Sequence, residues 1–260
     1  MFDGDVIAIT GGASGIGYST AERIVAQGGR VSLIDYKDGT ARDAAKRLDA
    51  SGAKAIGLVA DVTDGAAIQS ALKKTKEKFG RFDGLVAGAG IRQTSARIAD
   101  MPLATWEQIL KVDLTGTFLT CQAAARIFRE TKTAGAIVTV ASLSGHSPRL
   151  GQAAYCAAKA AVISLTKVLA LELADLKVRV NVVCPGTAIT PFNSEALQRE
   201  GEQGVQARIE GDTKQFRPGI PLRRLADAQD IADPIVFLLS SAAKHITGTE
   251  LFIDGGESVF

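Results

Sequence analysis

A tyrosine and a lysine four residues apart, Tyr155 and Lys159, end the stretch "SLSGHSPRLGQAAYCAAK" (142–159). On a helix, residues at i and i+4 lie on one face. A phenol has a pKa near ~10 and is a poor base at neutral pH, but a nearby ammonium group lowers this pKa by stabilising the phenolate. The pair could therefore take the proton of an alcohol while a hydride leaves for a nicotinamide. Ser142, thirteen residues before the tyrosine, could hydrogen-bond the same oxygen.

A glycine-rich turn, "TGGASGIG" (10–17), separates the first apolar run from the first helical pattern. Glycines in such a turn let backbone N–H groups approach a pyrophosphate, which the positive end of the following helix attracts. The motif alone is weak evidence, but its place between a strand and a helix predicts a dinucleotide site. The predicted contacts are Gly11, Ser14, Gly15, Ile16 and Gly17.

An aspartate, Asp35, ends the second apolar run, "RVSLID" (30–35). A carboxylate there can accept hydrogen bonds from the adenosine ribose and would repel a 2′-phosphate, so we expect NAD rather than NADP as the cofactor. The alternative is that Asp35 only starts a turn. Asp61 and Val62 end the third apolar run, where an acid could meet the adenine amino group.

The elements that would position these residues alternate regularly along the chain. Short, β-rich apolar runs predict buried parallel strands, and helical patterns fill the gaps between them. This alternation predicts an α/β fold of one domain, 1–260, with helices on both faces of a parallel sheet. The predicted strands are 5–10, 30–35, 53–60, 82–88, 135–142, 178–185 and 248–256, and the predicted helices are 15–28, 40–51, 64–79, 105–130 and 152–175.

One segment interrupts this alternation. Residues 186 to 222 carry five glycines, three prolines and many charges before a helical pattern resumes. A long irregular insertion after the carboxyl end of a strand predicts a lid or substrate-binding loop near 187–222. A solvated loop without a binding role is the alternative.

Composition excludes several other classes of protein. The 260 residues carry a formal charge of only +2 and no basic block, which argues against a nucleic-acid partner. Neither a secretory signal nor an apolar run of about 18 residues is visible, so we expect a cytoplasmic protein without a membrane span. The three cysteines, at 121, 156 and 184, fit no zinc spacing and suggest buried reduced thiols. With two histidines in the chain, we expect no metal site. His146 could be catalytic, but no acid is spaced to pair with it, so a loop histidine is favoured.

Taken together, "TGGASGIG", "ASLSG", "YCAAK", "RVNVVCPG" and the terminal "DGG" resemble the short-chain dehydrogenase/reductase family from residue 5 onward. The resemblance implies a seven-stranded Rossmann-like doubly wound sheet of order 3-2-1-4-5-6-7. It implies that Ser142 orients the substrate, that Tyr155 is the acid/base, and that Lys159 binds the nicotinamide ribose and lowers the tyrosine pKa. It places Pro185 and Gly186 beside the nicotinamide, and it suggests a homotetramer in which the helices near 105–130 and 152–175 pair.

Two positions depart from the family pattern. The family's "NNAG" is "AGAG" (87–90) here, which leaves Gly90 as a predicted cofactor contact with fewer polar neighbours. The family's asparagine, which holds a water of the proton relay, falls on Asp113. An aspartate can accept a hydrogen bond from that water but cannot donate one, and its charge favours a protonated Lys159. We expect Asp113 to take part in a functioning relay.

Within the family, "GHSPRLGQAAY" (145–155), "FRPGIPLRRLADAQDIAD" (216–233) and "HITGTELFIDGG" (245–256) are similar to dehydrogenases of 2,3-dihydro-2,3-dihydroxybenzoate in siderophore biosynthesis. The resemblance implies a small cyclohexadiene carboxylate that is oxidised to an aromatic catechol acid. The alternatives are a sugar, a polyol, a dihydrodiol or a 3-oxoacyl carrier-protein substrate. A non-catalytic nucleotide-binding regulator on the same fold is a remote alternative.

An arginine, Arg149, lies between Ser142 and Tyr155, and the similar dehydrogenases have an arginine after proline at this place. A guanidinium could pair with the carboxylate of a ring acid in bidentate fashion. Arg92, after the fourth predicted strand, is a second candidate. The alternative is that Arg149 only braces the loop or a subunit contact.

Overall fold

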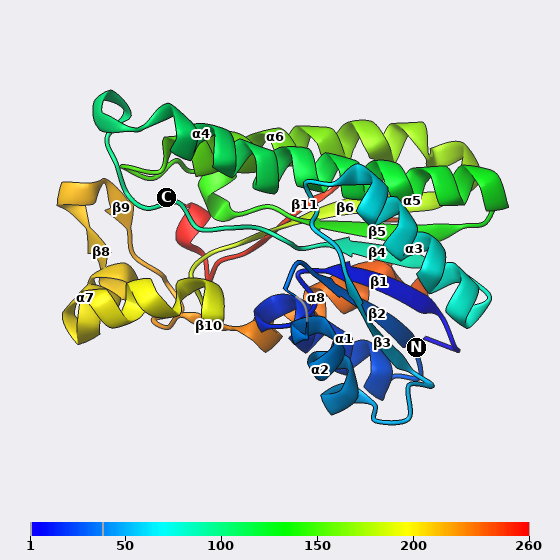
Figure 1. The fold of residues 1–260 in the computed structure, drawn as a ribbon. Coiled ribbons are helices and arrows are strands. Elements are labelled where there is room, and N and C mark those ends of the chain that lie inside the picture. Colours follow the sequence, from blue (N-terminus) through cyan, green and yellow to red (C-terminus); the bar gives the residue numbers. More distant parts are fainter. Residues whose placement is uncertain (1, 38, 260) are drawn as a thin grey trace.

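A seven-stranded parallel sheet forms the centre of the protein in the computed structural model, which describes residues 2–37 and 39–259 (Figure 1). The strand order is β11-β6-β5-β4-β1-β2-β3, which confirms the expected doubly wound order. All seven predicted strands are present, and each begins or ends within a few residues of its predicted limits. They are β1 Val6–Thr10, β2 Arg30–Asp35, β3 Ala55–Val59, β4 Gly84–Ala87, β5 Gly135–Val140, β6 Val178–Pro185 and β11 Glu250–Ile253.

Helices cover both faces of this sheet (Figure 1). One layer contains α1 Gly15–Ala26, α2 Thr40–Leu48 and α8 Ala228–Leu239. The other contains α3 Gly65–Phe79, α4 Leu103–Ile109, α5 Thr117–Thr131 and α6 Ala153–Glu172. A π-helical stretch, Leu110–Gly116, joins α4 to α5, so the helix predicted over 105–130 is one run with a wider turn inside it.

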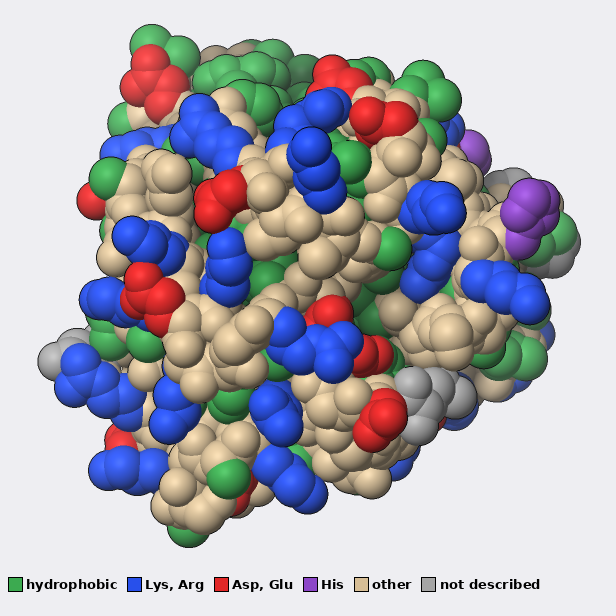
Figure 2. Space-filling view, turned by 90° about the vertical axis from the view of Figure 1, so that its right-hand side faces the viewer, with side chains coloured by type: hydrophobic (Ala, Val, Ile, Leu, Met, Phe, Trp, Pro, Cys, Tyr) green, Lys and Arg blue, Asp and Glu red, His purple; other side chains and the backbone are tan. Residues whose placement is uncertain are grey.

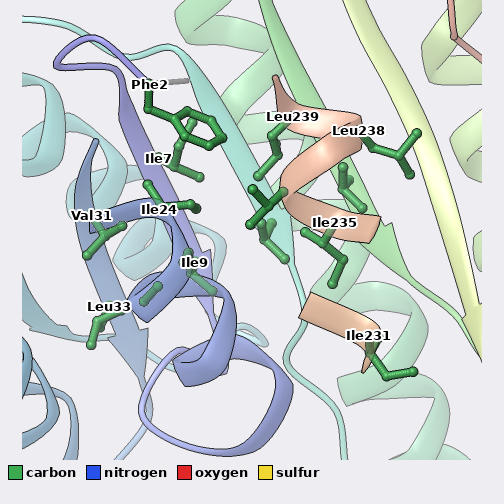
Figure 3. Packing of buried hydrophobic residues seen from close by; sticks show 14 of the residues in the cluster. Phe2, Ile7, Ile9, Ile24, Val31, Leu33, Ile231, Ile235, Leu238 and Leu239 are labelled. Atoms are coloured by element: carbon green, nitrogen blue, oxygen red, sulfur yellow. The ribbon is translucent and has the colours of Figure 1, made fainter. Parts of the chain in front are cut away.

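Apolar side chains from the sheet and both helix layers form the core. Figure 3 shows Ile7, Ile9 and Val31 of the strands facing Ile24 of α1 and Ile235 of α8. A second cluster fills the opposite face, where Leu72, Phe128 and Ile137 are fully buried. Because parallel strands are covered on both faces, their sequences are apolar almost throughout, which is why short continuous apolar runs predicted them well.

The parallel register brings the carboxyl ends of the strands to one edge of the sheet. Thr10 of β1 pairs in register with Ile34 of β2, and Ala87 of β4 pairs with Thr139 of β5. The chain turns from β1 towards β2 on one side and from β4 towards β5 on the other. Such a switch point opens a crevice at the carboxyl ends of the strands, where ligands of doubly wound sheets bind.

The segment predicted as irregular is largely helical, and that prediction was wrong. After β7 Ala188–Ile189, helix α7 runs over Pro191–Glu210, and the short pair β8 Gly211–Asp212 and β9 Arg217–Pro218 follows. Proline is well suited to the first helical position, and a single residue, Gly201 with φ 63° and ψ −171°, interrupts the helix. We call residues 187–222 the flap. In Figure 1 it lies apart from the sheet, beside the carboxyl ends of the strands.

By length and composition alone, one helix in the described part of the chain, α6, could cross a membrane. Half of its most apolar window is buried inside the protein. It packs on the sheet and carries the buried Lys159, as expected of a core helix.

Candidate active site

Ser142, Tyr155 and Lys159 meet at the carboxyl edge of the sheet. Ser142 follows β5, and its Oγ accepts a hydrogen bond from Ser144 N at 3.1 Å. Tyr155 and Lys159 share one face of α6, with Lys159 Nζ 5.6 Å from the centre of the tyrosine ring. Lys159 Nζ also donates to the Val140 carbonyl at 3.1 Å, so the lysine is tied to the last residue of β5.

A buried glutamine that the sequence analysis did not identify fixes the start of α6. Gln93 is 2 % exposed, and its Oε1 accepts from Tyr155 N at 2.9 Å. Its Nε2 donates to the Gly151 carbonyl at 2.8 Å. Gln93 lies in the segment after β4. Its two hydrogen bonds therefore fix the end of the loop before α6 and the first turn of α6, which carries Tyr155. A lone glutamine carries no recognisable spacing, because both of its contacts are distant in sequence.

Asp113 lies in the π-helical stretch and is completely buried. One carboxylate oxygen accepts from Ile91 N at 2.8 Å, and the other lies 3.4 Å from Lys159 Nζ without a hydrogen bond of ordinary geometry. Gly90 packs here, since a Cβ at this position would lie 3.1 Å from Asp113 Oδ2. Asp113 therefore forms a buried ion pair with the lysine.

The environment shifts the pKa values of all three buried groups. Burial raises the pKa of Tyr155, and Asp113 adds to the shift, whereas Lys159 and hydrogen bonding with Ser142 act in the opposite direction. The net direction is opposite to the one expected from the tyrosine–lysine pair alone, because burial outweighs the ammonium charge. Burial disfavours the charge of Lys159, but Asp113 and Tyr155 outweigh it and raise the lysine pKa. Burial also raises the pKa of Asp113, against the effect of Lys159.

A cavity of about 550 Å³ runs from the glycine-rich turn to the catalytic side chains. The turn is closely packed: a Cβ on Gly17 would lie 2.4 Å from the Gly11 carbonyl oxygen, and Gly11 itself has φ 68°. Ser14 caps α1 without a side-chain hydrogen bond, so the first turn of the helix keeps free backbone N–H groups. This cradle fits a pyrophosphate.

All predicted cofactor contacts line the cavity: Gly11, Ser14, Gly15, Ile16, Gly17, Asp35, Asp61, Val62, Gly90, Tyr155, Lys159, Pro185 and Gly186. Tyr36 and Lys37 line it as well and were not predicted.

A second cavity, of about 440 Å³, lies between the catalytic side chains and the flap. Ser142 and Tyr155 line both cavities, so a hydroxyl in one can meet a dinucleotide in the other. The predicted substrate residues Arg92 and Arg149 line the second cavity, and so does Phe192 of α7, whose ring centre is 6.2 Å from that of Tyr155.

Four arginines line this second cavity, and three of them are paired with protein carboxylates. Arg149 Nη2 donates to Glu257 Oε1 at 2.6 Å, and Arg217 Nε donates to the same oxygen at 3.1 Å. Arg208 pairs with Glu200 within α7. The fourth, Arg92, is paired with no carboxylate among the described residues. Its Nη1 donates to Asn193 Oδ1 at 2.6 Å.

Spacing along the chain does not reveal Arg208, Arg217 and Glu257, which were not predicted. Arg217 lies inside "FRPG", and Glu257 directly follows the terminal "DGG", so both stand in or beside quoted motifs. The alternative that His146 is catalytic finds no support, because His146 lines neither cavity. The centre of its ring lies 5.0 Å from the centre of the Phe252 ring. Across residues 2–37 and 39–259, no group of three or more His, Cys, Asp or Glu residues could hold a metal ion.

Comparisons with known proteins agree with this arrangement. The family described as "Enoyl-(Acyl carrier protein) reductase", a branch of the short-chain dehydrogenases, matches residues 11–258. The chain is 38% identical to 2-(S)-hydroxypropyl-CoM dehydrogenase 3 of Xanthobacter autotrophicus, over 97% of this chain and 96% of the relative. It is 35% identical to 2,3-dihydro-2,3-dihydroxybenzoate dehydrogenase of Bacillus subtilis, over 99% and 97%. A crystal structure of 3-ketoacyl-(acyl-carrier-protein) reductase from Brucella melitensis complexed with NADH superposes with a TM-score of 0.86 at 31% identity, covering 98% of this chain and 99% of that one.

Proposed function

The chain belongs to the short-chain dehydrogenase/reductase family of oxidoreductases, and we propose that it oxidises a ring hydroxyl of a cyclohexadiene-diol carboxylate, such as 2,3-dihydro-2,3-dihydroxybenzoate, with NAD. The observation that carries the proposal is Arg92, a cation without a carboxylate partner among the described residues, in the cavity that Tyr155 and Ser142 also line. The relative from Bacillus subtilis, named for this substrate, supports the same conclusion.

The chemistry follows from the buried side chains. Ser142 donates a hydrogen bond to the substrate oxygen, and the Tyr155 phenolate takes the proton of the hydroxyl. Lys159 stabilises that phenolate through its positive charge. The hydrogen bond from Lys159 Nζ to the Val140 carbonyl holds the lysine in place. Asp113 keeps Lys159 protonated. NAD, when bound, would supply the hydride acceptor beside the carbinol carbon, and the dienone formed by this oxidation would tautomerise to the catechol.

The substrate carboxylate meets Arg92 in this proposal. Burial is the main cause that lowers the pKa of Arg92, and Arg208 adds to it against the opposite effect of Glu200, so the guanidinium lies in a place where its charge is poorly solvated. An unpaired charge in a partly buried pocket is unfavourable, and a substrate anion would compensate it. Arg149 was the first candidate from the sequence, and we place it second here because its guanidinium already pairs with Glu257.

Asp35 supports the choice of NAD. It ends β2 within the cofactor cavity, and its Oδ1 accepts from Tyr36 N at 2.9 Å, so the carboxylate position is fixed. A 2′-phosphate at this place would be repelled. The solved structure of a similar reductase complexed with NADH is consistent with the choice.

We expect kcat/KM to be higher with NAD than with NADP. Asp35→Ala should weaken the binding of NAD and reduce the preference for NAD over NADP. Higher kcat/KM with NADP would refute the choice.

One steady-state experiment tests the substrate. NAD reduction is measured with 2,3-dihydro-2,3-dihydroxybenzoate and with the neutral cyclohexadiene diol that lacks the carboxylate, with sugars, polyols and a 3-oxoacyl thioester as further substrates. We expect the acid to be preferred, and Arg92→Ala to raise KM for the acid by about tenfold or more while changing KM for the neutral diol little.

Arg149→Ala is the matched comparison, because both arginines line the cavity and only Arg149 has a carboxylate partner among the described residues. A selective increase in KM for the acid in Arg149→Ala, and not in Arg92→Ala, would assign the carboxylate to Arg149. A preference for neutral sugars or thioesters would refute the proposed substrate. A protein that binds NAD but turns over none of these substrates would favour the alternative of a non-catalytic nucleotide-binding regulator.

A further inference from the structure

Glu257 is the most deeply buried acid of the substrate cavity, and the proposed chemistry gives it no role. It begins the 3₁₀ turn Glu257–Val259 just after β11, and its side chain is 0% exposed. The turn is well fixed, because Asp254 accepts hydrogen bonds from Gly256 N at 3.0 Å and from Ser258 N at 2.8 Å. The position of this carboxylate is therefore set by the fold.

The carboxylate joins three walls of the cavity. Arg149 comes from the loop before the catalytic helix, Arg217 from β9 of the flap, and Glu257 from the C-terminal segment, and all three line the cavity. Both guanidinium groups donate to one oxygen, Oε1. Arg217 also donates to Thr187 Oγ1 at 2.9 Å, which ties the far side of the flap to its start after β6.

The charges in this group do not balance. Two arginines share one glutamate, and Glu257 Oε2 is buried without a hydrogen-bond partner among the described residues. Burial lowers the pKa of Arg217, Glu257 raises it, and Arg208 and Arg149 lower it further. The arginines therefore repel one another, and Glu257 is the group that allows both to line the same cavity.

We propose that Glu257 is a positioning and specificity residue of the substrate cavity: it fixes Arg149 and Arg217 and cancels one of their two positive charges. The cavity then keeps a modest rather than a large affinity for anions. The flap also keeps its position relative to the loop that precedes the catalytic helix, because both are hydrogen-bonded to Glu257. The inference rests on the proposed function in that it assumes an anionic ring ligand.

The test uses ligands that do not react, so it does not depend on turnover. Dissociation constants of benzoate and of its neutral isostere benzamide are measured by calorimetry in the presence of saturating NADH. Glu257→Gln keeps the size of the side chain and leaves two uncompensated guanidinium groups. We expect its preference for benzoate over benzamide to increase about tenfold, and this gain to shrink in 0.5 M salt.

Three further variants separate charge from structure. Glu257→Asp keeps the charge and should keep the wild-type preference even if both ligands bind more weakly. Arg217→Gln together with Glu257→Gln removes one charge of each sign and should return the preference towards the wild-type value. Glu250→Gln, on β11 and paired with Lys167, lines neither cavity and should change nothing.

Equal changes in the affinities for benzoate and benzamide in Glu257→Gln would make the residue a structural brace and overturn the inference. Failure of either ligand to bind to wild type and variants alike would overturn it too. The proposed function fails separately, if the cyclohexadiene-diol carboxylate is not turned over while the benzoate preference still responds to Glu257.

Discussion

At the scale of single residues, Tyr155 is the group on which the chemistry depends most directly. It lines both cavities, and Lys159 and Ser142 both stabilise its ionised form. Tyr155→Phe removes the proton-transfer group and little else. We expect kcat to fall by about 10²–10⁴. Titration with NADH, followed by fluorescence, should show nearly unchanged binding. Near-full activity of the variant would refute the assignment.

Asp113 contributes to the pKa of the Tyr155 hydroxyl, after burial and Lys159. Oxidation of an alcohol needs the phenolate, so the rate rises as pH rises through the pKa of Tyr155. Burial raises this pKa and Asp113 adds to the effect, so the rising limb lies on the alkaline side. Asp113→Asn removes the negative charge and keeps an oxygen that can accept from Ile91 N.

For Asp113→Asn we therefore expect the rising limb of kcat against pH to move to lower pH. We expect kcat at the optimum to stay within roughly tenfold of wild type, because asparagine preserves the shape of the site. A full pH profile of both proteins between pH 6 and 11 checks this. A shift to higher pH would show that Asp113 acts mainly by keeping Lys159 charged, and a complete loss of activity would indicate a role beyond the ion pair.

The sequence predicted the residues whose relation is local and missed those that meet through the fold. Tyr155 and Lys159 are one helical turn apart, and Ser142 precedes them in the same stretch, so their spacing carried the information. Arg217 and Glu257 are 40 residues apart and meet only because β9 and the C-terminal turn converge on one cavity. Spacing along the chain cannot reveal such a contact.

At the scale of elements, the strands were predictable because burial on both faces makes them apolar throughout. The flap was not, because its glycines and charges are typical of loops, and yet most of it is α7. Ala196 is the one residue of the helix that is buried, so no apolar periodicity marks it. Pro191, directly after Thr190, was the available signal of a helix start.

Gly201 divides α7 into two parts, and Gly204, Ala207 and Arg208 of the second part line the substrate cavity. The φ of 63° and ψ of −171° of Gly201 lie in a region that only glycine adopts easily, and no atom lies within 4 Å of a Cβ built on it. Gly201→Ala should therefore cost about 1–3 kcal/mol of conformational strain without a steric clash. We expect the flap to rearrange, KM for the substrate to rise severalfold and NADH binding to be retained.

Gly80→Ala is the matched control for this change. Gly80 also has a positive φ, 77°, and open space around its Cβ, but it ends α3 and lines neither cavity. It should lower thermal stability by a similar amount and leave KM unchanged. An unchanged KM in Gly201→Ala, with stability lowered as in the control, would show that the conformation of Gly201 has no part in shaping the substrate cavity.

At the scale of the whole molecule, charge and apolar surface are distributed differently. On the face in Figure 2, Lys and Arg side chains are spread out with acidic side chains between them, rather than gathered in one block. Hydrophobic side chains gather along the upper edge of that view, the side on which α5 and α6 lie in Figure 1. Val168 and Leu171 of α6 are 48% and 80% exposed, and Phe118 of α5 is 42% exposed.

An exposed apolar surface of this kind on two neighbouring helices suggests contact with a second copy of the chain. We expect sedimentation velocity to show a homotetramer, in which α5 and α6 pair across subunits. Leu171→Glu places a charge in that contact, where burying it would be costly, so the tetramer should dissociate into smaller species. The folded subunit should be nearly as stable as before, because Leu171 is exposed in the single chain.

Ile98→Glu is the control, since Ile98 is equally exposed, 80%, but lies in the short 3₁₀ turn Ile98–Asp100 outside both helices. It should leave the assembly intact. A monomeric wild type, or a tetramer indifferent to Leu171→Glu, would contradict this assembly and leave the apolar face of α5 and α6 without its expected partner.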